Sequence, residues 1–437
     1  MIQAARRIVQ KLKLNGHEAF FAGGWVRDTL LHRKPKDIDI ATTARPDEVR
    51  QLFPKSTSIG AEFGVIQVQL YGCRFEVATF RSDEVYLDGR HPSSVTFSNP
   101  REDALRRDFT MNGLFYDPEI DRVIDYVRGR SDIRKRLIRA IGDPFRRFNE
   151  DKLRMMRAIR FACTLDFKIT EGTWHAILEL APRISSVSWE RIRDELIGIL
   201  TGPKPGLGLN MLHESGLLKQ ILPEVDDLRN RQACPGSSDN LLQHTAAAMD
   251  LLMHPYEIPA FGCLLHALGP AGCWIDSRFD EKPSLSGKEI VAKICRRLRI
   301  SRKDTDRIAG LVGSQALLLK IYEMRESDFK RFLRQPHFDE IMDIYRVHCI
   351  SLGLPLDVYQ YCKCMHKKCR QDHPSYKPLL KGEDLIREGY RPGPAFKKIL
   401  KTVEDLQLER KITTRKEAIR FVRATFPKRK QGHIDKN

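Results

Sequence analysis

The spacing of apolar residues changes near residue 138, and this change limits what the chain can fold into. Before it, short strand-like and helical segments alternate, and residues 37–41 place acids and isoleucines at a period of two. Beyond it the spacing is helical, as in residues 189–200, and strand signals fade. The sequence therefore predicts an N-terminal α+β domain followed by an all-α body and tail. The elements expected in the first domain are helices over residues 2–14 and 26–31, strands over 17–22, 37–41, 65–70 and 74–80, and a long exposed loop over 82–100.

Charge narrows the range of partners. The chain has 437 residues, with 75 Lys and Arg against 57 Asp and Glu, so its formal net charge is +18. Residues 128–160 hold 12 basic and 4 acidic side chains, and residues 410–437 hold 10 and 2. Two concentrated basic segments in different domains favour a polyanion, most often a nucleic acid, held at two places.

Composition also excludes a membrane-spanning protein and a largely disordered chain. No stretch approaches ~18 consecutive apolar residues, so we expect no membrane-spanning helix and no membrane partner. The hydrophobic fraction of 41% supports a sizeable core and excludes a largely disordered chain. The ten cysteines are scattered, and residues 1–16 lack the apolar core and cleavage site of a secretory signal. We therefore expect a reducing, cytoplasmic setting.

The strongest local pattern is a paired glycine followed by two spaced acids. Gly23 and Gly24 stand at an expected strand-to-helix junction, where backbone N–H groups can approach a phosphate. Arg27, one turn further on, can reach a phosphate as well. Asp37 and Asp39 lie two residues apart on an expected strand, so their side chains face the same way. Two such carboxylates can hold divalent metal for a two-metal phosphoryl transfer.

These motifs give the chain a resemblance to a known family. The runs GGWVRDTLLHRKPKDIDIA, RRDFTMNGLFYDP and AIGDPFRRFNEDKLRMMRAIRFA resemble, in this order, the signatures of class II template-independent RNA nucleotidyltransferases. These are the tRNA CCA-adding enzymes and their bacterial poly(A) polymerase relatives. The runs EVATFRSDEVYLDGRHPSSVTF and PLLKGEDLIREGYRPGPAFKKIL extend the resemblance over nearly the whole chain. It implies a polymerase-β-like nucleotidyltransferase domain with a mixed sheet, then an all-α body and tail.

The resemblance also implies roles for single residues. Asp37 and Asp39 are expected to bind two Mg²⁺ ions and to activate the 3′-hydroxyl of the tRNA acceptor end for attack on the α-phosphate of CTP or ATP, releasing pyrophosphate. Glu76 is a third candidate metal ligand. The residues expected to contact the triphosphate or to position ribose and phosphates are Gly24, Arg27, Arg107, Asp108, Asn112, Arg157 and Arg160. Asp151 and Arg154 are expected to read the base edge.

Residue chemistry agrees with base reading by this last pair. Asp151 lies one turn before Arg154 on an expected helix, where Arg154, Arg157 and Arg160 form one stripe. A carboxylate accepts from an exocyclic amino group, and a guanidinium donates to a ring nitrogen or carbonyl. Cytosine and adenine both carry an amino donor beside a ring-nitrogen acceptor, so the pair could accept C and A and reject U and G. The alternative is an ordinary salt bridge within the helix.

Three activities share this scaffold, and the sequence favours complete CCA addition. Residues 83–97 look like the flexible loop associated with adding the terminal A, which disfavours CC-only addition. Gly60, Phe63 and Gly64 match a Gly-x-x-Phe-Gly pattern of CCA-adding enzymes where poly(A) polymerases carry an Arg-rich stretch. A-only addition and polyadenylation remain alternatives. From another class, the alternative is a catalytically idle RNA-binding protein.

The middle of the chain resembles an HD phosphohydrolase module that has lost its chemistry. His244 and His266 match the first two ligand positions, but Ala267 stands where the aspartate belongs. Residues 286–289 and 312–315 lack the later histidines. We expect no phosphatase activity there, and we expect both histidines to be ordinary buried or polar residues.

A cluster of cysteines and histidines follows near residue 362. Cys362, His366, Cys369 and His373 lie along one face of an expected helix that covers about 16 Å, too far for all four to ligate one zinc ion. The final basic segment, residues 428–437, is expected to be disordered. The expected domains are a catalytic head (1–137), a base-recognition neck (138–200), a helical body with the degenerate HD-like region (201–350) and a tRNA-binding tail (351–437).

Overall fold

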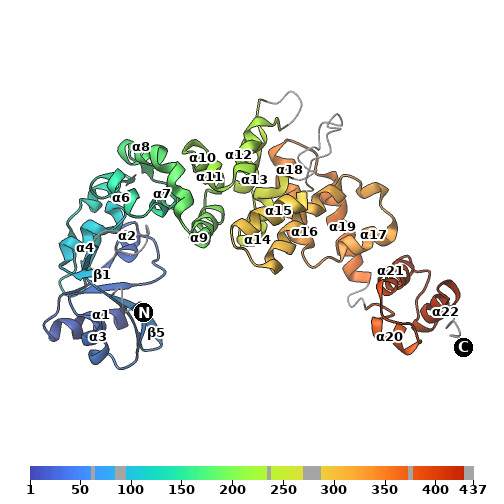
Figure 1. Cartoon of the computed structure of the whole chain (residues 1–437), viewed down its shortest axis with the longest axis horizontal. Coiled ribbons are helices and arrows are strands. Elements are labelled where there is room, and N and C mark those ends of the chain that lie inside the picture. The colour runs from blue at the N-terminus through green and yellow to red at the C-terminus, as the bar shows by residue number, and fades with distance from the viewer. Residues whose placement is uncertain (61–63, 84–94, 234–237, 269–286, 373–376, 428–437) are drawn as a thin grey trace, which may run out of the picture.

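The chain forms an elongated arch, with a sheet-containing head at one end and a small helical tail at the other (Figure 1). The structure, a computed structural model, describes residues 1–60, 64–83, 95–233, 238–268, 287–372 and 377–427. The predicted order of an α+β domain, a helical body and a helical tail is confirmed. Within these ranges every helix is too short or too polar to cross a bilayer.

A seven-stranded sheet in the order β3-β4-β5-β2-β1-β8-β9 forms the centre of the head. β2 and β5 run parallel to one another, and all other neighbours are antiparallel. The predicted mixed sheet is therefore confirmed. The strands are β1 (Ala19–Ala22), β2 (Asp39–Thr42), β3 (Ser56–Gly60), β4 (Val65–Leu70), β5 (Cys73–Thr79), β8 (Leu114–Asp117) and β9 (Arg122–Asp125).

Both faces of this sheet are apolar, and different helices cover them. Helix α1 (Ile2–Leu14) packs on the face that carries Phe21 and Ile40. Helix α4 (Pro100–Arg106) belongs to the cluster on the opposite face, which includes Phe20. Because side chains alternate along a strand, neighbouring phenylalanines serve opposite faces.

The segment predicted as a long loop has a short strand near each end, and these two strands pair with one another. β6 (Arg81–Asp83) pairs antiparallel with β7 (Val95–Phe97), and α4 then begins at Pro100. Residues 84–94, the centre of the expected flexible loop, lie outside the described residues. The turn-forming residues around 82–100 obscured the two short strands in the sequence.

The neck and body are helical apart from one small strand pair. β10 (Leu137–Ile138) and β11 (Lys168–Ile169) run parallel. The prediction that no strand occurs beyond residue 137 is therefore wrong for this pair. Two residues are too few to show a period in the sequence. The principal helices are α6 (Pro144–Glu150), α7 (Leu153–Leu165), α9 (Trp189–Leu200), α10 (Pro205–Glu214), α13 (Leu241–Asp250), α14 (Glu257–Leu265), α17 (Glu326–Leu333), α18 (Phe338–Ser351) and α19 (Asp357–Asp372).

Besides the small cluster around Phe20 in the head, two separate hydrophobic cores divide the described chain. The first runs continuously through head, neck and body and includes Cys362 of α19. The second belongs to the tail helices α20 (Gly382–Arg387), α21 (Pro394–Leu408) and α22 (Arg415–Thr425). The expected tail boundary at residue 351 therefore does not coincide with the change of core, which falls after α19. His366 stacks on Phe338 with ring centroids 4.1 Å apart, so its ring packs in the body; His373 and residues 428–437 lie outside the described residues.

Substitution of Gly208 in α10 tests how closely this helix must pack against the helices of the neck. A methyl group there would meet Ile199 Cγ2 at 2.3 Å and Cys163 Sγ at 3.1 Å. Because overpacking a core costs about 1–3 kcal/mol, Gly208→Ala should lower the free energy of unfolding by that amount. Gly172→Ala, in helix α8 (Glu171–Leu180), meets nothing within 4 Å and should raise it by about 0.5–1 kcal/mol. Urea denaturation measures both changes, and equal stability of the two variants would contradict the packing described.

Candidate active site

One edge of the head sheet brings the glycine turn and the acidic side chains together. β1 and β2 are antiparallel, and their register sets Ala22 opposite Asp39. β2 and β5 are parallel with Ile40 opposite Val77, which places Glu76 beside Asp39 on the same face of the sheet. The turn that follows Ala22 therefore lies next to these carboxylates.

The negative charges of neighbouring acids change the pKa of Asp39. Burial and the negative charges of Asp37 and Glu76 raise the pKa of Asp39 to about 6, against the lowering effect of Arg107. Asp37 is exposed and precedes β2, so the strand begins two residues later than predicted. Ile38 is buried between the two aspartates, which gives the alternation on which the prediction of a shared face depended.

Gly23 is held in a conformation and a space that suit glycine. Its φ is +61°, in the left-handed region, and a Cβ there would lie 2.9 Å from Arg107 Nη1. Arg107 Nη1 donates to the backbone O of Asn112 at 3.1 Å, and its Nη2 donates to Asp103 Oδ2 at 3.0 Å. Asp103 is buried, and sequence reasoning missed it. Gly24 opens helix α2 (Gly24–Leu30) directly after this turn.

A continuous set of polar contacts leads from the head to the neck. Arg27 Nη1 donates to Asn112 Oδ1 at 2.8 Å, and Asn112 Nδ2 donates to Asp108 Oδ1 at 3.0 Å. Arg157 of α7 donates to Asp108 Oδ2 from Nε at 2.9 Å and from Nη2 at 2.7 Å. Burial by itself would raise the pKa of Asp108, but Arg157 and Asn112 outweigh it and hold that pKa at about 2. Asp108 is therefore ionised and fixes both partners.

Three arginines gather around one aromatic ring at the end of these contacts. The guanidinium carbons of Arg27, Arg157 and Arg160 lie 5.1, 5.5 and 4.5 Å from the centroid of Phe161. Glu195 of α9 accepts from Arg160 Nε at 2.6 Å and lies 3.6 Å from Arg157 Nη1. This concentration of guanidinium groups suits a polyphosphate. Sequence reasoning missed Phe161, although it directly follows Arg160, and missed Glu195, which has no local signal.

Asp151 and Arg154 have different partners. Asp151 lies between α6 and α7 in an extended conformation, and its Oδ1 accepts from the backbone N of Leu153 at 3.1 Å. The prediction that one helix carries both residues is therefore wrong, because Asp151 satisfies the first turn of α7 from outside it. Its Oδ2 accepts from Arg191 Nη2 at 2.8 Å. Arg154 is only 8% exposed and donates to Glu150 Oε2 at 2.9 Å.

The donor set at the sheet edge suits a hard divalent cation. Asp37, Asp39 and Glu76 offer carboxylate oxygens, the ligands that such ions prefer. The raised pKa of Asp39 reflects negative charge that Arg107 only partly offsets, and a divalent ion would offset more of it. The three carboxylates do not all come within 4.8 Å of one another.

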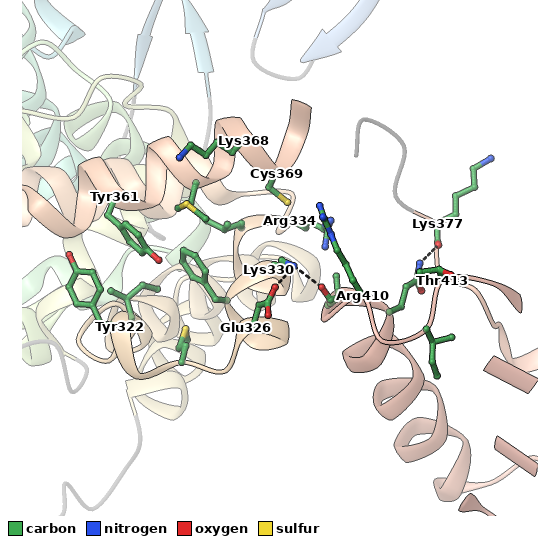
Figure 2. A pocket seen from close by; sticks show the side chains of 18 residues that line it. Tyr322, Glu326, Lys330, Arg334, Tyr361, Lys368, Cys369, Lys377, Arg410 and Thr413 are labelled. Carbon is green, nitrogen blue, oxygen red and sulfur yellow. Dashed lines mark hydrogen bonds and ion pairs between the residues drawn. The ribbon is translucent and has the colours of Figure 1, made fainter. Parts of the chain in front are cut away.

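A second candidate surface lies between the body and the tail. A cavity of about 980 Å³ separates α17 and α19 from α21 and the segment that follows it (Figure 2). Figure 2 shows Tyr322 and Tyr361 at one end and Lys377 and Thr413 at the other. Aromatic rings beside cationic groups suit a nucleic acid, which offers bases and phosphates. The basic and aromatic lining residues are Tyr322, Phe329, Lys330, Arg334, Tyr361, Lys368, Lys377 and Arg410.

Comparison with known proteins first defines the class. Residues 19–139 match the family described as "Poly A polymerase head domain". Residues 166–228 match the family described as "Probable RNA and SrmB- binding site of polymerase A". A mixed sheet with acids at its edge, matched to this head domain, defines a nucleotidyltransferase.

Individual relatives then define the family. The CCA-adding enzyme of Bacillus licheniformis is 34% identical over 417 residues, which cover 94% of this chain and 95% of that protein. The CCA-adding enzyme of Geobacillus sp. strain WCH70 is 47% identical over 229 residues, 52% of this chain and 56% of that protein. The solved Bacillus stearothermophilus CCA-adding enzyme in complex with CTP is 28% identical, with a TM-score of 0.73 over 97% of each chain. The chain belongs to the CCA-adding enzyme family of tRNA nucleotidyltransferases, whose reaction depends on divalent metal.

Asp108→Asn tests the ion pair that joins head and neck. The variant keeps the shape of the side chain but removes the carboxylate that Arg157 contacts through Nε and Nη2, leaving only Glu195 at 3.6 Å, so the free energy of unfolding should fall by about 2–3 kcal/mol. The pKa of Asp108 is lower in the folded protein, at about 2, than its ordinary value of 3.8. Its stabilising contribution is therefore complete above about pH 4 and is lost as the pH falls towards 2.

Urea denaturation of the wild type and Asp108→Asn at several pH values measures this contribution. The difference between them should be constant near neutral pH and should shrink below about pH 4. Asp166→Asn is the matched control, because Asp166 is exposed and pairs with Lys204 at the surface. It should leave the free energy of unfolding nearly unchanged, because solvent screens this exposed pair. A difference for Asp108→Asn that stays constant down to about pH 2 would contradict the ion pair.

Proposed function

We propose that this protein adds CMP and AMP to the 3′ end of tRNA and so builds or repairs the CCA end from CTP and ATP. One observation carries the proposal: Arg27 and Arg157, two of the arginines around Phe161, belong to one contact network through Asn112 and Asp108. Arg107 donates to the backbone of the same Asn112, and its positive charge acts on Asp39. The alignment with the Bacillus licheniformis CCA-adding enzyme over 95% of its length supports it. A related structure in complex with CTP supports the nucleotide substrate.

Catalysis is assigned to Asp37 and Asp39. We assign Mg²⁺ as the ion, with Glu76 as a third candidate ligand; when bound, it polarises the α-phosphate and lowers the pKa of the RNA 3′-hydroxyl. The carboxylate of Asp39 is held in position because β2 is paired on both sides, with β1 and with β5. Attack of the 3′-oxygen on the α-phosphorus forms the new phosphodiester, and pyrophosphate leaves. The exposed side chain of Asp37 remains accessible to substrate.

Triphosphate binding is assigned to the glycine turn and to the arginines beside it. Gly24, at the start of α2, allows close approach of the nucleotide, and Arg27, Arg107, Arg157 and Arg160 supply positive charge. Asn112 positions Arg27 and Arg107, and Asp108 positions Arg157, through the hydrogen bonds described above. Glu195 positions Arg160. Because each guanidinium is already held by a neighbour, little side-chain freedom is lost when the nucleotide binds.

Base selection is assigned to Asp151 and Arg154. Arg191 holds the Asp151 carboxylate, and Glu150 holds the Arg154 guanidinium, so both groups have a fixed direction. A fixed acceptor and a fixed donor match the amino group and ring nitrogen that C and A share. Selection then needs no nucleic-acid template.

The remaining domains are assigned to the tRNA. The neck segment 128–160 and the tail segment 410–437 carry most of the excess positive charge. The neck segment and the described part of the tail segment, residues 410–427, lie in different parts of the arch (Figure 1). The cavity between body and tail has basic side chains from the tail in its lining, among them Lys377 and Arg410. We propose that residues 1–137 form the catalytic head, 138–200 the base-recognition neck, 201–350 the helical body and 351–437 the tRNA-binding tail. We also propose a cytoplasmic setting. The eight cysteines that the structure describes are free thiols, which supports a reducing compartment.

Double substitution Asp37→Ala with Asp39→Ala tests the catalytic assignment. It removes the proposed metal ligands, so nucleotide incorporation should fall about 10³-fold or more while tRNA binding persists. The measurement is transfer of labelled CMP and AMP to tRNAs that end at the discriminator base, at C or at CC. Asp47→Ala, an exposed acid on helix α3 (Pro46–Leu52), is the matched control and should keep full activity.

The same assay separates the alternatives. Addition of A alone to the CC-ended tRNA would assign the protein to A-only addition, and long A tails would assign it to polyadenylation. Binding of tRNA with no incorporation into any of the three would make it an idle RNA-binding protein. Full activity of the double variant would overturn the catalytic role of the two aspartates.

Asp151→Ala tests the base-reading assignment. Loss of a charged hydrogen-bond acceptor should lower kcat/KM for CTP and ATP about 10–100-fold. Because UTP gains nothing from that carboxylate, its kcat/KM should change much less, and discrimination between CTP and UTP should fall. Asp194→Ala, on the exposed side of α9, is the matched control. Equal losses for CTP and UTP would show that Asp151 does not read the base.

A further inference from the structure

Three buried histidines of the body converge on one point. They come from α13 (His244), from the short 3₁₀ helix η5 (His266–Leu268) that follows α14, and from α18 (His348). His244 Nε2 lies 3.1 Å from His266 Nε2 and 3.0 Å from His348 Nδ1, and the latter two lie 3.1 Å apart. Their side chains are 3% or less exposed. Within the described ranges, no other group of three His, Cys, Asp or Glu side chains lies within 4.8 Å.

The outer nitrogens of two of these rings determine where their protons lie. His266 Nδ1 faces the backbone O of Cys263 and must donate to it, because a carbonyl only accepts. Ser351 Oγ donates to Val347 O at 2.8 Å, so it accepts from His244 Nδ1 at 2.9 Å. A neutral imidazole carries one N–H. The Nε2 atoms of both rings therefore point lone pairs at each other.

Two facing lone pairs need a positive centre between them. In both rings the single N–H lies on Nδ1, so neither Nε2 can donate to the other. The remaining proton source is His348 Nδ1, and one proton shared between two acceptors satisfies neither fully in a buried site. A bound cation would satisfy all three nitrogens at once.

We propose that His244, His266 and His348 bind one divalent transition-metal ion of the zinc class. Tetrahedral zinc with bonds of about 2.0–2.1 Å sets its ligand nitrogens about 3.3 Å apart, close to the separations observed. The outer contacts of His244 and His266, to a hydroxyl and to a backbone carbonyl, are those that orient metal-bound imidazoles. The sequence prediction that both histidines are ordinary residues lacked the third ring, which comes from a position far along the chain.

The donor set differs from that expected of an HD module. Ala267 supplies no carboxylate, and His348 supplies a third neutral nitrogen in its place. Nitrogen donors favour zinc-class ions over Mg²⁺, which prefers oxygen. The ion would join α13, η5 and α18, three segments of the body core, and this role is independent of the nucleotide-transfer chemistry proposed for the head.

The test measures metal content in full-length protein purified without a polyhistidine tag. Mass spectrometry of the metals should find about one zinc-class ion per chain in the wild type and in the Asp37→Ala, Asp39→Ala double variant. His348→Gln should lose most of it, and His254→Gln, an exposed histidine of the same body, should keep it. Retention by His348→Gln at the wild-type level would overturn the site.

A second measurement does not depend on the folding of a variant. Cobalt(II) added to metal-free wild-type protein should give the intense visible absorption of a tetrahedral nitrogen site, saturating at about one equivalent. Binding to the folded state should also raise the thermal midpoint of the wild type. A weak octahedral spectrum with an unchanged thermal midpoint would overturn the proposal, whatever the outcome of the nucleotide-transfer assays.

Discussion

The buried ion pair between Asp108 and Arg157 fixes the head relative to the neck. Asp108 belongs to the last part of the head, and Arg157 belongs to the first long neck helix, 49 residues later. The buried charge of Asp108 could not be held at an acceptable free energy without the half-buried guanidinium of Arg157. The pair therefore orients α7, and with it Arg154 and Arg160, relative to the acids at the sheet edge.

Much of the positive charge near this pair is held in place before any ligand arrives. Asp103 fixes Arg107, and Glu195 fixes Arg160. These acids reduce the net charge of the region, which weakens long-range attraction for a polyanion, but they remove the freedom of long side chains. Geometry that is already set favours selection between similar nucleotides, whereas loose positive charge favours only tight binding.

Local features of the fold could be predicted from the sequence because they have a local period. The strands around Asp39 and Glu76, the glycine turn and helix α9 follow directly from spacing and turn chemistry. The expectation of one helix over Asp151 and Arg154 failed because an aspartate can satisfy a helix start from outside it. The spacing of charges alone does not distinguish these two arrangements.

Partners that arrive from distant positions could not be predicted in this way. Glu195 meets Arg160 across 35 residues, and Arg191 meets Asp151 across 40. His348 meets His244 across 104 residues. Glu195, Arg191 and His348 each lie on an ordinary helix whose pattern reports only that one face is buried. Packing of the whole neck and body decides which polar side chain on that face finds a partner.

The two metal sites inferred for this chain use opposite donor chemistry, and that difference keeps their ions apart. Carboxylate oxygens at an open sheet edge favour a hard ion that exchanges readily with substrate and solvent. Imidazole nitrogens enclosed by three helices favour a borderline ion that leaves slowly, because opening the site disturbs the body core. A zinc-class ion at the sheet edge would compete with Mg²⁺, since affinity alone favours the transition metal. A buried nitrogen site in the body gives such an ion a more favourable position, so one chain can hold both without mixing them.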